Sequence, residues 1–256
     1  MEIVINPKYS ALSSFIHSVP DIFEREGVTI YKARNEIKIY SVEDEEKGIH
    51  YSLNVKSYKI PIFINRIAYT FFRATKARRA YEYALKIISK NVTTPEPVAF
   101  IEEKKHGLLN RSFFICLHTP LDGNMRIASE EKNFEKIRAV TIAFGKFTAE
   151  LNKKNILHID YSPGNILYKK NNDGTFNFSI IDINRMKFCK VNMKTGCKNF
   201  CRMYAPDVFF TTAGKAYAEA MGYDEKACVN LIMKYRKREW IKRERRYRLK
   251  KLFKKN

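Results

Sequence analysis

The sequence lacks a long apolar run, and its N-terminus lacks the features of a secretion signal. No segment reaches the roughly twenty apolar residues that a transmembrane helix needs. The N-terminus does not have the charged segment followed by an apolar one that marks a signal peptide. These absences argue against a membrane-spanning protein and predict one that stays inside the cell.

Cysteines are few and irregularly placed. The five are Cys116, Cys189, Cys197, Cys201 and Cys228. The spacing of the three between positions 189 and 201 fits no common zinc pattern. Thiols inside the cell are normally kept reduced. The sequence therefore predicts neither a disulfide framework nor a zinc site.

Acidic residues are scarce relative to basic ones. There are 27 Asp and Glu against 48 Lys and Arg, which gives a formal net charge of +21 over 256 residues. With 45% hydrophobic residues the chain is long enough to bury a substantial core. The hydrophobic content predicts a globular protein, and the excess of basic residues predicts an anionic partner.

One loop has the spacing of a phosphoryl-transfer site. Asp160 and Asn165 lie five residues apart, and Asp182 ends a nearby predicted strand. An aspartate here can orient a hydroxyl and accept its proton, while an amide and a carboxylate supply the oxygen ligands that Mg²⁺ prefers. Pro163 and Gly164 favour the sharp turn that such a loop needs.

The flanking pattern supports this interpretation over the alternative that Asp160, Asn165 and Asp182 only stabilise turns and a strand end. Apolar residues from 134 to 151 recur every three or four positions, as in an amphipathic helix. After the loop, two short predicted strands are joined by the turn 171–174. This order of helix, loop, hairpin and aspartate is that of the C-lobe of a kinase.

A kinase also needs a strand lysine and a helix glutamate in an N-lobe. Lys56 ends an alternating segment and could reach nucleotide phosphates, although a lysine on a strand is often only solvated. Glu82 lies on a predicted helix and is its best candidate partner. It also lies four residues from both Arg78 and Lys86, so surface ion pairs are a competing explanation.

The predicted fold is therefore α+β and protein-kinase-like, with two lobes. We expect an N-lobe over 1–118, with a five-stranded antiparallel sheet and one main helix, and a hinge over 119–126. A mostly helical C-lobe with the catalytic loop, metal site and acceptor site would span 127–232. A basic tail would occupy 233–256.

The chain resembles the bacterial lipopolysaccharide kinase family, and within it the Kdo-kinase branch. The resembling segments are Val55 to Tyr58, Lys76 to Glu82, Thr94 to Pro97, His158 to Leu167, and Ile181 to Met186. The resemblance implies ATP and Mg²⁺ as cofactors and a hydroxyl of Kdo in the lipid A inner core as acceptor. Asp160 would be catalytic, Lys56, Glu82, Asn165 and Asp182 would bind the nucleotide complex, and Asn165 and Asp182 would bind the metal.

Several departures from protein kinases narrow the function. No glycine-rich loop precedes Lys56, and Ile159 replaces the arginine that pairs with a phosphorylated activation loop. Asn184 stands where protein kinases have a glycine after the metal-binding aspartate. Ser162 occupies the position of a lysine near the γ-phosphate, for which Arg185 could compensate. These differences argue against a regulated protein kinase.

The C-terminal segment concentrates positive charge. Met233, Trp240 and Tyr247 recur every seven residues through it, which predicts a basic helix with a narrow apolar stripe. We expect this tail to bind an anionic membrane surface, which we favour over nucleic acid because the acceptor implied by the resemblance is lipid-linked. A solvated or frayed helix is the third alternative. The protein would then be cytoplasmic and peripheral on the inner face of the bacterial inner membrane.

The sequence also allows other functions. They are a heptose kinase of the lipopolysaccharide core, a small-molecule phosphotransferase, an RNA- or ribosome-associated atypical protein kinase, and a non-catalytic pseudokinase. The catalytic residues are shared by all but the last. The sequence does not identify the hydroxyl that is phosphorylated, the residues that bind the acceptor or the oligomeric state.

Overall fold

The computed structural model describes residues 1–253, apart from the side chains of residues 249, 250, 252 and 253. The chain divides into two compact units. Unit 1 contains residues 1–120 and 182–184, and unit 2 contains residues 121–181 and those from 185 onward. No helix among the described residues combines the length and the apolar character that crossing a bilayer requires.

Unit 1 is built on an antiparallel sheet of six strands in the order β1-β5-β6-β4-β3-β2. The strands are β1 (Glu2–Ile5), β2 (Val28–Lys32), β3 (Glu36–Asp44), β4 (Ile49–Tyr58), β5 (Pro97–Lys105) and β6 (Leu108–Leu117). The sheet has one strand more than the predicted five, because β1 pairs with the outer side of β5. β1 has only four residues, too few to show a clear alternation.

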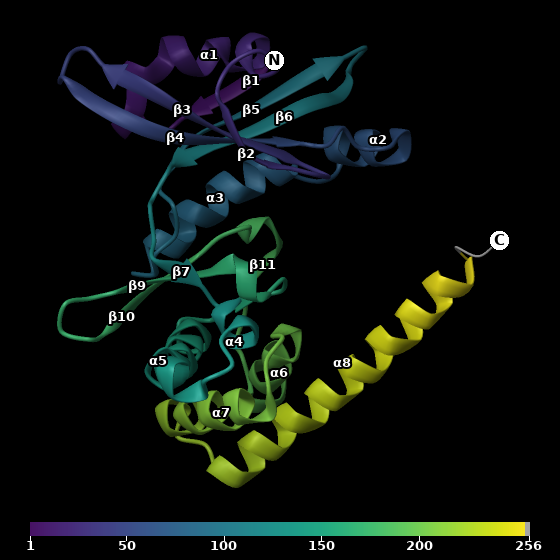
Figure 1. The fold of residues 1–256 in the computed structure, drawn as a ribbon. Coiled ribbons are helices and arrows are strands. Elements are labelled where there is room, and N and C mark those ends of the chain that lie inside the picture. Colours follow the sequence, from purple (N-terminus) through teal and green to yellow (C-terminus); the bar gives the residue numbers. More distant parts are fainter. Residues whose placement is uncertain (254–256) are drawn as a thin grey trace. The chain divides into compact units, whose positions relative to one another are not determined.

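Helices cover both faces of this sheet (Figure 1). They are η1 (Pro7–Leu12) and α1 (Ser13–Ile22) on one face and α3 (Lys76–Ile88) on the other, whereas α2 (Phe63–Phe71) lies at the margin. The alternation of strand side chains separates two clusters. Leu53, Val55 and Ile115 pack with η1 and α1, whereas Phe100 and Phe114 pack with α3. Lys56 follows Val55 and therefore lies on the face of the sheet that α3 covers.

Unit 2 is mostly helical, with two small sheets of order β10-β9-β7 and β11-β8. Its helices are α4 (Ile127–Glu130), α5 (Phe134–Lys153), α6 (Met193–Asn199), α7 (Asp207–Met221) and α8 (Glu225–Phe253). Its strands are β7 (Gly123–Asn124), β8 (Ile156–His158), β9 (Ile166–Lys170), β10 (Phe176–Ile180) and β11 (Met186–Phe188), and η2 (Pro163–Asn165) and η4 (Phe200–Arg202) are short 3-10 turns. A further 3-10 turn, η3 (Ile183–Arg185), contains the point where the chain returns to unit 2.

The core of unit 2 anchors the loop that contains Asp160. Phe144 of α5 stacks on Tyr161 with ring centroids 5.7 Å apart, and the Tyr161 hydroxyl is 2.9 Å from Thr148 Oγ1. Gly145 lets α7 approach α5 closely, because a Cβ there would collide with the carbonyl of Ala213. Burial raises the pKa of Tyr161, so this residue is a neutral anchor.

The predicted tail is part of a longer helix. α8 begins at Glu225 and packs its first turns against α6 and α7 through the buried Cys228 and Ile232. Residues 244–248 are all exposed. Met233, Trp240 and Tyr247 share one side of the helix as predicted by their spacing, but Ile241 points elsewhere. Basic residues surround the helix, so its polar and apolar sides are poorly separated.

Candidate active site

The loop after β8 is closed by its own hydrogen bonds. Ser162 N–H donates to the Asp160 carbonyl at 2.7 Å, and Asn165 N–H donates to the Ser162 carbonyl at 2.9 Å. The Asn165 side chain also donates from Nδ2 to the Asp160 carbonyl, at 2.9 Å. The nitrogen of this amide is therefore used for the loop, and its oxygen is the atom suited to a metal.

His158 connects this loop to the segment before Asp182. Its buried ring accepts a hydrogen bond at Nδ1 from Asp160 N–H, at 3.1 Å. The proton of the neutral ring is then on Nε2, which donates to the Ile181 carbonyl at 2.9 Å. Ile181 N–H in turn donates to the Asn165 carbonyl at 3.0 Å. His158 thus fixes the backbone of the loop, and is a positioning residue rather than a base.

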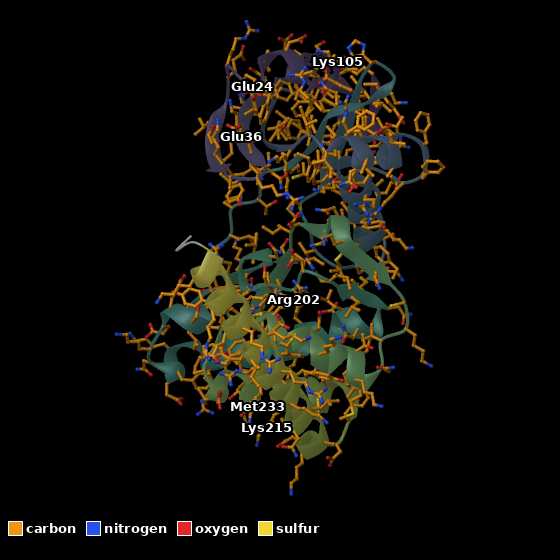
Figure 2. All side chains as sticks on the ribbon, turned by 90° about the vertical axis from the view of Figure 1, so that its right-hand side faces the viewer. Glu24, Glu36, Lys105, Arg202, Lys215 and Met233 are labelled. Atoms are coloured by element: carbon orange, nitrogen blue, oxygen red, sulfur yellow. The ribbon has the colours of Figure 1, made fainter. Side chains whose placement is uncertain are left out.

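Two arginines flank the carboxylate of Asp160. Arg202 Nη1 lies 3.0 Å from Oδ1, and Arg185 Nη1 lies 3.9 Å from Oδ2. Arg202, labelled in Figure 2, ends the turn η4, 42 residues after Asp160. The sequence had indicated Arg185 as a cation near the γ-phosphate, not as a partner of Asp160, and had given Arg202 no role. The two cations place positive charge beside this carboxylate, where an acceptor would bind.

A third arginine borders the same loop. The guanidinium of Arg126 lies beside Gly164, where an added Cβ would come within 2.8 Å of Nη2. Gly164 does not have a positive φ, and the guanidinium is the flexible end of a side chain, so neither the turn nor this approach demands glycine. Arg126 is exposed and precedes α4. The loop is consequently bordered by arginines from three separate segments of unit 2.

In unit 1, Lys56 forms an ion pair with Asp182. Lys56 Nζ is 2.7 Å from Asp182 Oδ1, and the exposed side-chain fractions are 16% for the lysine and 31% for the aspartate. Asn184 Nδ2 donates to the same oxygen at 2.7 Å. The residue that replaces the glycine of protein kinases thus orients the predicted metal-binding carboxylate. Sequence reasoning gave Asn184 no such role.

Asp182 has an unusual backbone conformation. Its φ is +54°, in the left-handed region that non-glycine residues seldom adopt and that Asp and Asn tolerate best. Strain of this kind often occurs at functional residues, where surrounding contacts hold it in place. Here the contacts from Lys56 and Asn184 provide that support.

Tyr58 forms an aromatic surface beside this ion pair. Its ring centroid is 5.3 Å from Lys56 Nζ, and its side chain is buried. Burial, and secondarily the charge of Asp182, raise the pKa of Tyr58 well above its ordinary value. Burial also raises the pKa of the neighbouring Cys116 to about 12. Both residues therefore stay neutral, and Lys56 is the cation paired with Asp182.

The structure does not form the predicted pair of Lys56 with Glu82. Glu82 is exposed on α3, whose buried side is formed by residues such as Tyr81 and Ala84. Among the described residues, the carboxylate that pairs with Lys56 is Asp182. The Lys56 ammonium group pairs with the carboxylate of Asp182, and the Glu82 side chain faces solvent.

The predicted metal ligands have the right chemistry for Mg²⁺. No group of three or more His, Cys, Asp and Glu side chains converges in the described part of the chain. Mg²⁺ needs only one or two protein oxygens and completes its octahedron with water and phosphate. The carboxylate of Asp182 and the amide oxygen of Asn165 fit this requirement.

Cys197 and Cys228 are buried with their sulfurs 3.4 Å apart, whereas Cys189 is exposed.

Two comparisons with known proteins found similar proteins. Residues 29–221 match the sequence model of a family described as lipopolysaccharide kinase (Kdo/WaaP). A solved structure titled "WaaP in complex with acyl carrier protein" is similar in fold, with a TM-score of 0.58 and 13% identity. The similarity covers 94% of this chain and 100% of the WaaP chain. A search of curated proteins gave no match.

Proposed function

Because the chain belongs to the lipopolysaccharide kinase (Kdo/WaaP) family, we propose that it transfers the γ-phosphoryl group of ATP to a hydroxyl of Kdo in a lipid A precursor. Family membership makes the chain an ATP-dependent phosphotransferase. The finer proposal, a Kdo acceptor with Mg²⁺ as cofactor, depends on the residues around Asp160 and Asp182.

The contacts of the side chains support the following proposed roles. Asp160, held by His158 through its backbone, would orient the acceptor hydroxyl and take its proton. Lys56, which pairs with Asp182 in the structure, would position the nucleotide phosphates as a point charge when Asp182 also binds a metal ion. Asn165 and Asp182 would hold Mg²⁺, which supplies neutralisation of phosphate charge when bound.

The observation that carries the Kdo assignment is the pair of arginines at Asp160. Kdo is a sugar acid, and its carboxylate can pair with a guanidinium, whereas heptose has no carboxylate. Arg185 is 62% exposed and Arg202 is 45% exposed, so both are accessible to an acceptor. An anionic sugar beside Asp160 would be favoured by this arrangement.

The test is phosphoryl transfer measured by mass spectrometry. Purified protein is incubated with ATP, Mg²⁺ and either Kdo-bearing lipid A or heptose-bearing core. We expect one added phosphate on the Kdo-bearing acceptor and none with Asp160→Ala. Transfer only to the heptose-bearing core would refute the Kdo assignment and leave the kinase assignment intact. No transfer to either would refute both acceptors.

We further propose that α8 attaches the enzyme electrostatically to the anionic cytoplasmic face of the bacterial inner membrane. Each Lys or Arg near such a surface contributes about 1 kcal/mol. The truncation that tests this should follow Arg243, because Arg236 pairs with Asp207 and the Arg243 guanidinium lies 3.8 Å from the Tyr204 ring centroid. We expect the truncated protein to lose salt-sensitive binding to anionic vesicles while it retains turnover on a detergent-solubilised acceptor.

A protein partner is a second proposal, since the similar WaaP structure was solved with acyl carrier protein. Binding of purified acyl carrier protein, measured by calorimetry, would test it. Unchanged heats on titration would rule out such a complex for this chain.

A further inference from the structure

The helix α2 attaches to unit 1 by its polar side. Arg66 Nε donates to the Leu109 carbonyl at 2.7 Å, and Leu109 N–H donates to Thr70 Oγ1 at 2.9 Å. Leu109 belongs to β6, so these bonds fix the helix to the sheet. Figure 1 shows α2 at the margin of unit 1, in the connection between β4 and α3.

The apolar side of α2 faces outward. None of its residues is fully buried. The large exposed side chains of α2 and its two cap residues, with their exposed fractions, are Ile62 at 70%, Phe63 at 64%, Ile64 at 73%, Phe71 at 66% and Phe72 at 82%. A surface helix of a globular protein normally turns its apolar side inward. The reversed orientation leaves an apolar patch of the kind that marks an interaction site.

Positive charge frames this apolar patch. Lys59 and Arg73 are exposed before and after the helix, and the sequence from Lys59 to Lys76 contains no acidic residue. Apolar side chains flanked by cations match an anionic bilayer, where headgroup phosphates meet the cations and acyl chains receive the apolar groups.

We propose that α2 inserts its apolar side into the interface of an anionic lipid bilayer. This contact is distinct from that of α8, because it is driven by burial of apolar surface and persists when salt screens charge. It supplies unit 1 with its own membrane contact. The biological purpose rests on the proposed lipid-linked acceptor, but the binding itself does not.

The first experiment compares vesicle binding of wild type and Ile64→Gln/Phe71→Gln by sedimentation. The vesicles contain equal amounts of phosphatidylglycerol and phosphatidylethanolamine, with pure phosphatidylcholine as the uncharged comparison. Glutamine keeps the charge and suits a helix. The matched control is Val28→Gln, which changes a 69% exposed side chain of β2 in the same unit. Thermal melting establishes that all variants fold.

At about 1 M salt the Debye length is only about 3 Å, so binding through α8 is suppressed. We expect wild type and the Val28 control to retain binding there, and the double variant to bind at least about tenfold more weakly, as removal of two buried apolar side chains implies. Equal high-salt binding of all three proteins would overturn the proposal.

The second experiment locates the contact. Trp240 is the only tryptophan and lies on α8. In Trp240→Phe/Phe72→Trp the single tryptophan reports on the end of α2. We expect its emission to move to shorter wavelengths on addition of vesicles at high salt, whereas Trp240 of the wild type should respond only at low salt. No shift for the residue 72 probe would overturn the proposal.

Wild type and the double variant also distinguish two other partners that the apolar side of α2 could bind. A wild-type dimer in size-exclusion chromatography that becomes monomeric in the double variant would overturn the lipid assignment in favour of a second copy. Binding of acyl carrier protein that the double variant loses, without vesicle binding, would overturn it in favour of a protein. Turnover on a detergent-solubilised acceptor should be the same in wild type and double variant, so failure of the proposed reaction is measured separately.

Discussion

Asp182 combines a carboxylate role with a backbone role, and two substitutions separate them. Asp182→Gly and Asp182→Ala both remove the oxygen that accepts from Lys56 and Asn184. Only alanine keeps a Cβ on a backbone with φ of +54°. We therefore expect both variants to lose phosphoryl transfer, and alanine to be the more destabilising of the two.

The magnitudes follow from exposure and conformation. Lys56 and Asp182 are partly exposed, so the pair is worth less than a fully buried one, and loss of its charged hydrogen bonds costs about 1–2 kcal/mol. A Cβ in the left-handed region costs about 1–2 kcal/mol. The glycine variant loses part of this advantage, because glycine gives the unfolded chain more conformational entropy than alanine does. The net expectation is that Asp182→Ala is less stable than Asp182→Gly by about 1 kcal/mol.

Urea denaturation followed by circular dichroism measures this difference. Asp182→Asn is the matched control, because asparagine tolerates the left-handed region and keeps one acceptor oxygen without the charge. It should be more stable than the alanine variant and still impaired in transfer. If Asp182→Ala proved as stable as Asp182→Gly, the argument from strain would be wrong. Full activity of Asp182→Ala would refute the assignment of the metal ligand.

Three further predictions concern other residues. Arg202→Gln should raise the KM for the Kdo acceptor about tenfold and leave that for ATP unchanged, since one charge-assisted hydrogen bond is lost; steady-state kinetics in which both KM values rise equally would contradict this role. His158→Ala should lower kcat at least about tenfold and stability by about 2 kcal/mol, because two backbone hydrogen bonds are lost; an unchanged kcat would mean that the loop holds itself. Burial raises the pKa of Tyr40 from 10 to about 12, so wild-type stability should be intact below pH 10 and fall as pH rises toward 12, when the unfolded state ionises first. Tyr40→Phe should be less stable at neutral pH by about 1 kcal/mol, because its hydroxyl donates to the Glu26 carbonyl, and melting curves should show the gap narrowing above pH 10; a constant gap would refute the ionisation argument.

The parts of the fold that are local in sequence could be predicted. Alternating residues gave the position of β4, and three-to-four spacing gave α5, since the period of the apolar residues indicates each of these elements. The catalytic loop was recognisable because Asp160, Pro163, Gly164 and Asn165 lie within six residues. The prediction of a kinase-like fold is confirmed by the family match and the similar WaaP structure.

Contacts between distant residues could not be predicted. Lys56 and Asp182 are separated by 126 residues, and spacing cannot say which carboxylate lies closest to an ammonium group. The same holds for Arg202 at Asp160. Glu82 was chosen because it lies on the right helix, but a helix presents several faces, and only packing decides which one reaches the sheet.

The charge of +21 alone does not choose between a membrane and a nucleic acid, because cations bind either polyanion. The helix α2 supplies the missing argument. A phosphate backbone would leave exposed side chains such as Ile64, Phe71 and Phe72 in water, whereas a bilayer removes them from it. Binding to nucleic acid should disappear as salt rises, since it depends on release of counterions. Binding that survives high salt and requires α2 therefore favours lipid, and makes α8 the long-range and α2 the short-range part of the same attachment.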